Sequence, residues 1–322
     1  MVMDRWRGVL KVQLDPNSKK YYRIATSLCF SPASKSLIVP SANAIFFNGD
    51  RVEGTRNPVV ERLSDLQNIG EVLVSKFGGW VNAWVIEASI FNGPFAVYKD
   101  FIPSLNTYGE PLSYSPLPFP SSTSTLSLLS NCLLQARNAI SSELGKPCSI
   151  SLSSSQSPKT LILGFSKGGT VVNQLVTELG SFEDNPGHVR ELDELSGVEE
   201  ETRMIPTTRE GLLNSITEIH YVDVGLNSSG AYITDRNVIE SISKRVAGGA
   251  SGIRFVLHGT PRQWCDSRRS WIREEKDRLC RLLESEAERS GGKLKVCERF
   301  YFGDRTPDMQ MHFEVIEKMD VS

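Results

Sequence analysis

The pattern of apolar and polar positions begins with two strand-like runs. Residues 6–14 and 21–30 carry this pattern, and the turn-forming sequence at 15–18 between them predicts an antiparallel hairpin. Residues 43–47 form the next apolar strand, and helical spacing of apolar side chains predicts a helix over 59–76. The chain therefore opens with β structure before its first helix.

The remaining sequence alternates between strands and helices. Apolar strands are predicted at 82–88, 160–163, 217–224, 252–257 and 293–302, and helices at 125–142, 170–179, 234–246, 271–290 and 308–319. Such alternation produces a mostly parallel sheet, because each helix returns the chain to the start of the next strand. We expect a single α/β domain over residues 1–322, with a central sheet of about eight strands, helices on both faces and the N-terminal hairpin.

One segment interrupts the alternation. Residues 183–203 are acidic and poor in apolar side chains. Such a composition favours a solvated surface segment over a core element. We therefore predict an acidic insertion or flexible lid within the domain.

Composition excludes several classes of protein. Hydrophobic residues make up 39% and charged residues 23%, as in soluble globular proteins, and the formal net charge of −2 gives no electrostatic argument for binding nucleic acid. Apolar runs are shorter than the roughly 20 residues of a transmembrane helix, and the first ten residues do not form a secretory signal. We expect a cytoplasmic protein with no transmembrane segment.

Neither a metal nor a cofactor is predicted. The six cysteines include no Cys-x-x-Cys pair, which argues against a disulfide framework or a structural zinc site. The glycine-rich sequence at 248–252 precedes a strand instead of following one, so it does not fit a dinucleotide-binding loop. We expect reduced, mostly buried thiols.

The sequence at 164–169 indicates a site for nucleophilic catalysis. Ser166 lies between Gly164 and Gly168, after the strand at 160–163 and before the helix at 170–179. A sharp strand-to-helix turn of this type, a nucleophile elbow, exposes a serine hydroxyl and needs small residues two positions on either side. This arrangement predicts the α/β-hydrolase fold class, with Ser166 as the nucleophile.

A serine nucleophile needs a histidine base. In this fold the order along the chain is serine, acid, histidine, so the base follows the last strand. Of the four histidines, His312 has that position. His220 lies within a predicted strand, His188 lies in the acidic segment, and His258 precedes the expected acid, so we interpret these three as structural, supporting or solvated.

The acid and the oxyanion donors are less sharply defined. Asp266, in the loop after the strand at 252–257, is the favoured acid, and Asp223 is the alternative. The oxyanion hole would use the backbone N–H of Lys167 and that of Asp50 or Arg51. A carboxylate at Asp50 would oppose a developing oxyanion unless it points away, and we expect the Lys167 side chain to be solvated.

Five segments together resemble an uncharacterised eukaryotic family of lipase-like α/β-hydrolases whose human member is named as an open reading frame of chromosome two. The segments are 45–50, 164–169, 221–225, 258–271 and 311–313. The resemblance extends over most of the chain from about residue 46 and implies the fold and a role for Ser166. The family's animal members are mitochondrial and carry an N-terminal extension that we do not expect here, so a mitochondrial location is the alternative to a cytoplasmic one.

The sequence thus predicts a serine hydrolase that acts on an ester or thioester. Ser166, His312 and Asp266 would form its triad, and a small-molecule ester or acyl compound would be the substrate. The alternative is a catalytically silent hydrolase fold that binds a protein partner, as the position of Asp50 and the acidic segment suggest. A third hypothesis is a lipid-facing hydrolase, with residues 91–119 bordering an acyl pocket.

Overall fold

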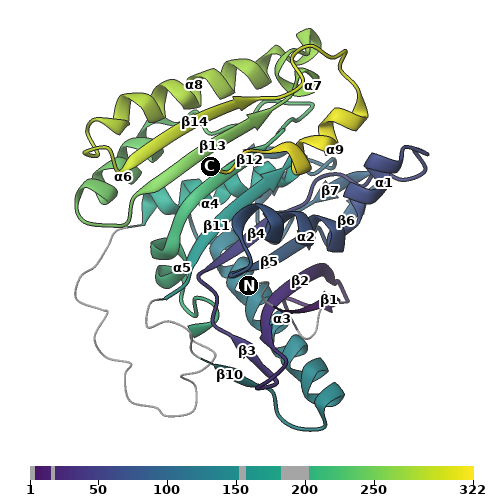
Figure 1. The fold of residues 1–322 in the computed structure, drawn as a ribbon. Helices are drawn as coiled ribbons and strands as arrows, with labels where there is room; N and C mark the ends of the chain where they lie inside the picture. The colour runs from purple at the N-terminus through teal and green to yellow at the C-terminus, as the bar shows by residue number, and fades with distance from the viewer. Residues whose placement is uncertain (1–3, 16–18, 152–156, 183–202) are drawn as a thin grey trace.

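A mixed ten-stranded sheet forms the centre of the molecule (Figure 1). The computed structural model describes residues 4–15, 19–151, 157–182 and 203–322. The strands of the sheet are β1 (Arg5–Val12), β2 (Tyr22–Ser31), β3 (Ser36–Ile38), β4 (Ala42–Phe47), β5 (Val81–Glu87), β10 (Ser149–Ser151), β11 (Lys159–Phe165), β12 (Ile216–Val222), β13 (Ile253–Gly259) and β14 (Leu294–Phe300). Their order is β10-β3-β2-β5-β4-β11-β12-β13-β14, and β1 pairs with β2.

The strand directions confirm the prediction of a mostly parallel sheet with an antiparallel N-terminal hairpin. β2 runs antiparallel to β1, β3 and β5, whereas β5, β4, β11, β12, β13 and β14 are parallel from neighbour to neighbour. Three of the four residues of the predicted hairpin turn, 16–18, lie outside the described residues. Because parallel strands point the same way, the carboxyl ends of β4, β11, β12 and β13 meet at one edge of the sheet.

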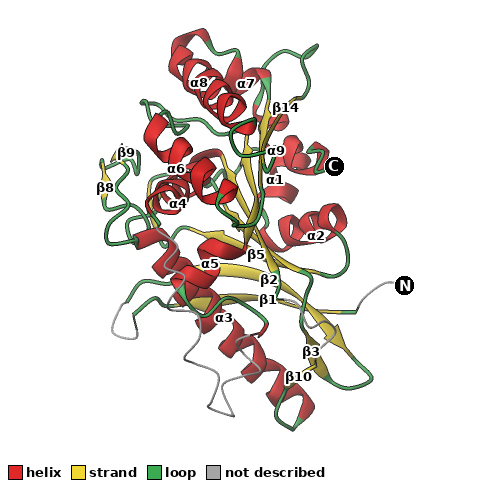
Figure 2. Cartoon of the chain, turned by 90° about the vertical axis from the view of Figure 1, so that its left-hand side faces the viewer, coloured by secondary structure: helices red, strands yellow, loops and turns green. Residues whose placement is uncertain are grey.

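Helices cover both faces of the sheet, which completes the predicted α/β-hydrolase architecture (Figure 2). One face carries α1 (Pro58–Ser64), α2 (Leu66–Phe77) and α9 (Met309–Lys318); the other carries α3 (Pro120–Leu144), α4 (Gly169–Ser181), α5 (Arg209–Ser215), α6 (Arg236–Ala247) and α8 (Ser270–Ala287), and the short α7 (Pro261–Trp264) follows β13. Two small hairpins, β6 (Ile90–Asn92) with β7 (Phe95–Val97) and β8 (Ser104–Leu105) with β9 (Pro111–Ser113), precede α3.

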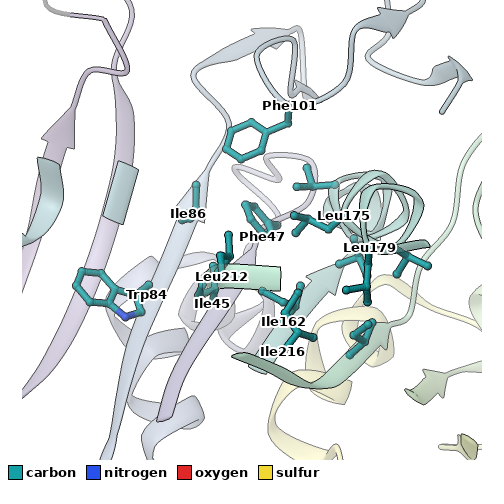
Figure 3. Packing of buried hydrophobic residues seen from close by; sticks show 14 of the residues in the cluster. Ile45, Phe47, Trp84, Ile86, Phe101, Ile162, Leu175, Leu179, Leu212 and Ile216 are labelled. Carbon is teal, nitrogen blue, oxygen red and sulfur yellow. The ribbon is translucent and has the colours of Figure 1, made fainter. Parts of the chain in front are cut away.

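Side chains of the central strands alternate between two cores. On β4, Ala44 and Phe46 belong to the core beneath α1, α2 and α9, and Ile45 and Phe47 belong to the core beneath α3 and α4. Figure 3 shows Phe47 pointing toward Leu175 of α4 and Ile45 among the other buried side chains of this core. Each fully buried side chain of this size contributes about 1.5–3 kcal/mol, so the strands that carry the candidate site are firmly held from both sides.

Local capping explains where helices differ from the prediction. The helix expected over 59–76 is divided at Asp65, whose carboxylate accepts hydrogen bonds from the backbone N–H groups of Gln67 and Asn68 and so begins α2. α3 begins at Pro120, ahead of the expected residue 125, because proline is favoured in the first turn of a helix. The helix expected from residue 234 begins at Arg236, because the side chain of Asp235 caps α6 by accepting the backbone N–H of Asn237.

The predicted acidic insertion and the predicted single domain are not tested by the described residues. Residues 183–202 of the predicted acidic insertion lie outside them, so both that insertion and the single domain stay predictions. Within the described part of the chain, no helix is long and apolar enough to cross a membrane. All six cysteines are free, and four of them are buried, as expected.

Candidate active site

Ser166 occupies a strained position in the turn between β11 and α4. Phe165 ends β11, residues Ser166–Gly168 form a single 3-10 turn, and α4 begins at Gly169. The backbone of Ser166 has φ +52°, a left-handed conformation that costs a non-glycine residue on the order of 1 kcal/mol or more. The surrounding strand and helix impose this conformation, which presents the side chain at the carboxyl edge of the sheet.

The two glycines around Ser166 permit this tight turn. A Cβ at Gly164 would come within 2.5 Å of the Val172 side chain in α4, and one at Gly168 would come within 2.0 Å of the Phe47 carbonyl at the end of β4. Either distance is a severe overlap, so both positions require glycine. The contact with Phe47 also places the turn that follows β4 directly beside Ser166.

His312 and Asp223 form a buried hydrogen-bonded pair. Nδ1 of His312 lies 2.6 Å from Oδ2 of Asp223. Asp308 fixes the start of α9, the helix that carries His312, by accepting the backbone N–H of Met311. Asp223 follows β12 in a left-handed conformation with φ +45°, and its carboxylate also accepts the backbone N–H and the hydroxyl of Thr260. The carboxylate is therefore held by donors on two elements.

The sequence-based preference between the two aspartates is corrected by this geometry. Asp266, the favoured acid, caps the turn Ser267–Arg269 by accepting the backbone N–H of Arg268, and it accepts Nε of Arg269 at 2.9 Å. Asp223, the alternative, faces His312 instead. The short helix α7 separates Asp266 from the end of β13, whereas Asp223 directly follows β12, the strand beside β11.

A small cavity joins Ser166 to His312. It has a volume of about 250 Å³ and is lined by Ser166, His312, Lys167, Asp50 and Arg262, among others. The His312 ring packs on Phe165, with ring centroids 4.6 Å apart. Among the described residues, neither Oγ of Ser166 nor Nε2 of His312 has a hydrogen-bond partner. Both atoms are thus available to a molecule in the cavity, and catalytic hydrogen bonds commonly tighten only when substrate binds.

The turn after β4 carries the backbone N–H groups of Asp50 and Arg51, one of which is the predicted second donor of the oxyanion hole. The N–H of Arg51 donates to the Pro94 carbonyl at 2.8 Å, which leaves Asp50 as the candidate donor of this turn beside Lys167. The carboxylate of Asp50 accepts the backbone N–H of Ala96 at 2.8 Å and lies 3.4 Å from Nζ of Lys167. Its negative charge is therefore compensated by the lysine.

Lys167 is buried, so the expectation of a solvated side chain is wrong. Only 2% of the residue is exposed. Nζ donates to the Tyr108 carbonyl at 2.8 Å and lies 4.5 Å from the centre of the Phe95 ring. Burial lowers the pKa of Lys167 and raises the pKa of Asp50, and in each case the partner's charge opposes the effect of burial. The two residues form an ion pair in the wall of the cavity.

His220 lies inside the sheet, as expected, and His258 lies there too, because β13 extends to Gly259 instead of ending at the expected residue 257. His220 and His258 are fully buried on β12 and β13, and their rings are joined by a 3.1 Å contact between Nδ1 of His220 and Nε2 of His258. His188 lies outside the described residues. That Thr260 donates to Asp223 is not predicted from the sequence. The position of Thr260 directly after β13, at the edge of the sheet where β12 also ends, is the signal that indicates it.

Comparison with known proteins gives one family. A model of the family described as C2orf69 matches residues 124–287. The mitochondrial protein C2orf69 homolog of Danio rerio is 26% identical over 263 residues, which cover 79% of this chain and 64% of that protein. Mitochondrial protein C2orf69 of Homo sapiens is 24% identical, with 86% of this chain and 74% of that protein covered. The chain thus spans less than two thirds of the Danio rerio relative's length.

Solved structures with a similar fold include esterases and related hydrolases. The siderophore hydrolase EstA from Aspergillus nidulans matches with a TM-score of 0.44 and 14% identity, covering 98% of this chain and 92% of that one. An S-formylglutathione hydrolase from Agrobacterium tumefaciens matches with a TM-score of 0.40 and 10% identity, covering 99% and 94%. With identities this low and TM-scores below 0.5, these matches assign no activity or substrate to this chain.

Proposed function

Because the chain belongs to the C2orf69 family and has a hydrolase-like fold, we propose from its cavity that it is a serine hydrolase cleaving a small ester or thioester. The observation that carries the proposal is the 2.6 Å hydrogen bond between His312 and Asp223, beside the cavity that Ser166 and His312 line. A histidine held by a buried carboxylate next to a strained serine is the arrangement that activates a hydroxyl nucleophile.

In the first step Ser166 takes up the acyl group. Oγ attacks the carbonyl carbon of the substrate while Nε2 of His312 accepts the hydroxyl proton. Asp223 holds Nδ1–H, which keeps Nε2 unprotonated beforehand and stabilises the imidazolium that forms. When the tetrahedral intermediate collapses, the bond to the alcohol or thiol breaks, and His312 returns the proton to that leaving group. The product is an acyl-Ser166 intermediate.

In the second step a water molecule hydrolyses the acyl-Ser166 intermediate and releases the carboxylic acid. His312 accepts a proton from this water as its oxygen attacks the acyl carbon. The ester bond to Ser166 then breaks, and the proton passes from His312 to Oγ. In both steps the carbonyl oxygen becomes negative, and the backbone N–H groups of Lys167 and Asp50 are the proposed donors. The ion pair between the side chains of these residues keeps the Asp50 charge from opposing the oxyanion.

The cavity favours a small acyl group over a lipid chain. Its volume of about 250 Å³ lies below the ~300–1,000 Å³ typical of sites for drug-sized ligands. A long acyl chain would need further space that this cavity does not contain. Short acyl esters should therefore be the better substrates, and a preference for long ones would instead support the lipid-facing hypothesis.

Labelling with a fluorophosphonate tests the proposal directly. The native protein should react at Ser166, as peptide mass spectrometry would locate, and Ser166→Ala should lose labelling and reduce hydrolysis of 4-nitrophenyl acetate by at least about 10³-fold. His312→Ala should slow labelling while leaving Ser166 in place. If folded native protein never reacts, the activity is absent, and the alternative becomes a catalytically silent module that binds a protein partner.

The protein could lie in the cytoplasm or in the mitochondrion, the two locations that the sequence leaves open. The relatives from Danio rerio and Homo sapiens are named mitochondrial proteins, which supports the mitochondrial alternative over the cytoplasmic one. A fluorescent fusion imaged beside a mitochondrial marker separates the two. Diffuse fluorescence would support the cytoplasm, and overlap with the marker would support the mitochondrion.

A further inference from the structure

The wall of the cavity contains an arginine that the proposed mechanism does not use. Arg262 lies in α7, directly after β13, and lines the same cavity as Ser166 and His312. Its Nε is buried and has no hydrogen-bond partner. Among the described residues its guanidinium forms no ion pair. The residue as a whole is only partly buried, but a buried N–H group without a hydrogen-bond partner is costly, which suggests that a ligand supplies the partner.

A second arginine on the same wall is held in place by its neighbours. Arg269 also lines the cavity, and its side chain is 19% exposed. Its Nε donates to Asp266 at 2.9 Å and its Nη2 donates to the Arg262 carbonyl at 3.2 Å. The side chain of Arg269 thus links Asp266 to the backbone of Arg262. These hydrogen bonds hold the two arginines close together in the segment after β13.

The carboxylates of the cavity are already used by other partners. Asp50 pairs with Lys167, so that lysine is not the unpaired cation of the site. Asp223 binds His312 and Thr260. Burial and then the charge of Arg269 lower the pKa of Arg262, and the charges of Asp223, Asp266 and Asp308 oppose that shift. An anion placed between the two arginines would further offset their repulsion.

We propose that the substrate is an anionic ester or thioester whose carboxylate or phosphate group is bound by Arg262 and Arg269 while its carbonyl carbon lies at Ser166. The proposal rests on the proposed function and names its substrate class. A planar guanidinium group matches the paired oxygens of both carboxylate and phosphate groups, with bonds stronger than those between neutral groups.

A second, neighbouring cavity offers space for the anionic end of the substrate. This second cavity has a volume of about 570 Å³, and Asn227, Arg262 and Arg269 line it together with the first. A substrate can thus keep its acyl carbon beside Ser166, place its anion between the arginines and extend any further polar part outward. The short acyl group proposed above remains in the smaller cavity.

The test measures binding without turnover. Ser166→Ala protein is titrated by calorimetry with 4-acetoxybenzoate, with the neutral 4-acetoxybenzamide and with 4-acetoxyphenyl phosphate. At least one anion should bind about tenfold or more tightly than the amide, and Arg262→Gln in the same background should remove that preference. Whichever anion binds more tightly identifies the recognised group, carboxylate or phosphate.

Arg281→Gln is the matched control. It removes the same charge, but Arg281 is exposed on α8 and lines neither of the two cavities. The anion preference should survive this change. Equal binding of amide and anions, or an anion preference unaffected by Arg262→Gln in a variant with an unchanged melting temperature, would overturn the proposal.

The binding test and the labelling test can fail separately. Labelling of Ser166 without an anion preference would keep the hydrolase and reject this substrate class. An Arg262-dependent anion preference in a protein whose native form never reacts with fluorophosphonate would reject the hydrolase, and with it the anionic compound as a substrate, while leaving an anion-binding site.

Discussion

Two hydrogen-bonded pairs that contain histidine lie along or just beyond β12, but in different surroundings. At the carboxyl edge of the sheet, Asp223 after β12 binds His312. Within the strands, His220 of β12 binds His258 of β13, and both rings are fully buried. His312 is also buried, with 6% of its surface exposed, but it lines a cavity together with Ser166.

The difference shows that a hydrogen-bonded histidine is not by itself a site. The inner pair is saturated by protein groups: His220 contacts Glu218 through Nε2, and His258 contacts the hydroxyl of Tyr301 through Nδ1. The outer histidine has one nitrogen occupied by Asp223 and the other open to the cavity. The proposed chemistry requires this open nitrogen of His312, whereas we expect the inner pair to contribute to stability alone.

The largest expected effect separates the two aspartates. Asp223→Asn should lower the hydrolysis rate by about 10³–10⁴-fold, because the amide no longer holds Nδ1–H and stabilises no imidazolium. Asp266→Asn should lower it by less than about tenfold, since that carboxylate contacts Arg269 and not His312. Rates with 4-nitrophenyl acetate and melting temperatures of both variants provide the measurement. A larger rate loss in Asp266→Asn than in Asp223→Asn would contradict the assignment.

The next effect concerns the inner pair. His258→Gln should reduce the free energy of unfolding by about 1–3 kcal/mol, because it disturbs buried hydrogen bonds to His220 and Tyr301. Its hydrolysis rate should stay within about twofold of the parent, since this ring lies inside the sheet. Urea unfolding and the ester assay measure the two quantities. A large rate loss with unchanged stability would assign the inner pair to the site.

The smallest effect is on the pH dependence of stability. Burial lowers the pKa of His220 and His258 below the ordinary value of 6.5, that of His258 well below it. The folded protein therefore binds fewer protons than the unfolded chain just below pH 6.5, so stability that is present above 6.5 is lost as the pH falls through the lowered values. The slope is at most about 1.4 kcal/mol per pH unit for each proton.

Urea unfolding at pH 7.5 and pH 5.5 checks this direction. The charged groups around the pair are Glu218, Arg254, Arg299 and Asp320. The parent should lose more stability between the two pH values than His258→Gln, which retains one imidazole of the pair. Equal losses would show that the inner histidines do not control this dependence.

The alternation of strand and helix was accessible to sequence reasoning because it depends on local periodicity. Apolar residues at 160–163, followed by two closely spaced glycines and an amphipathic helix, predicted β11, the turn and α4. The helix over 59–76 was less accurate, because Asp65 looks like an ordinary helical residue until its side chain caps α2. Periodicity defines the face of a helix better than its ends.

The sequence by itself determined the order of elements, the turn that carries Ser166 and the position of His312 after the last strand. Only the tertiary structure decided that Asp223 faces His312, that Lys167 is buried against Asp50 and that Nε of Arg262 has no hydrogen-bond partner. The reason is physical: helix and strand periodicity arise from neighbours along the chain, whereas the pairing of polar side chains depends on how separate strands end at a shared edge.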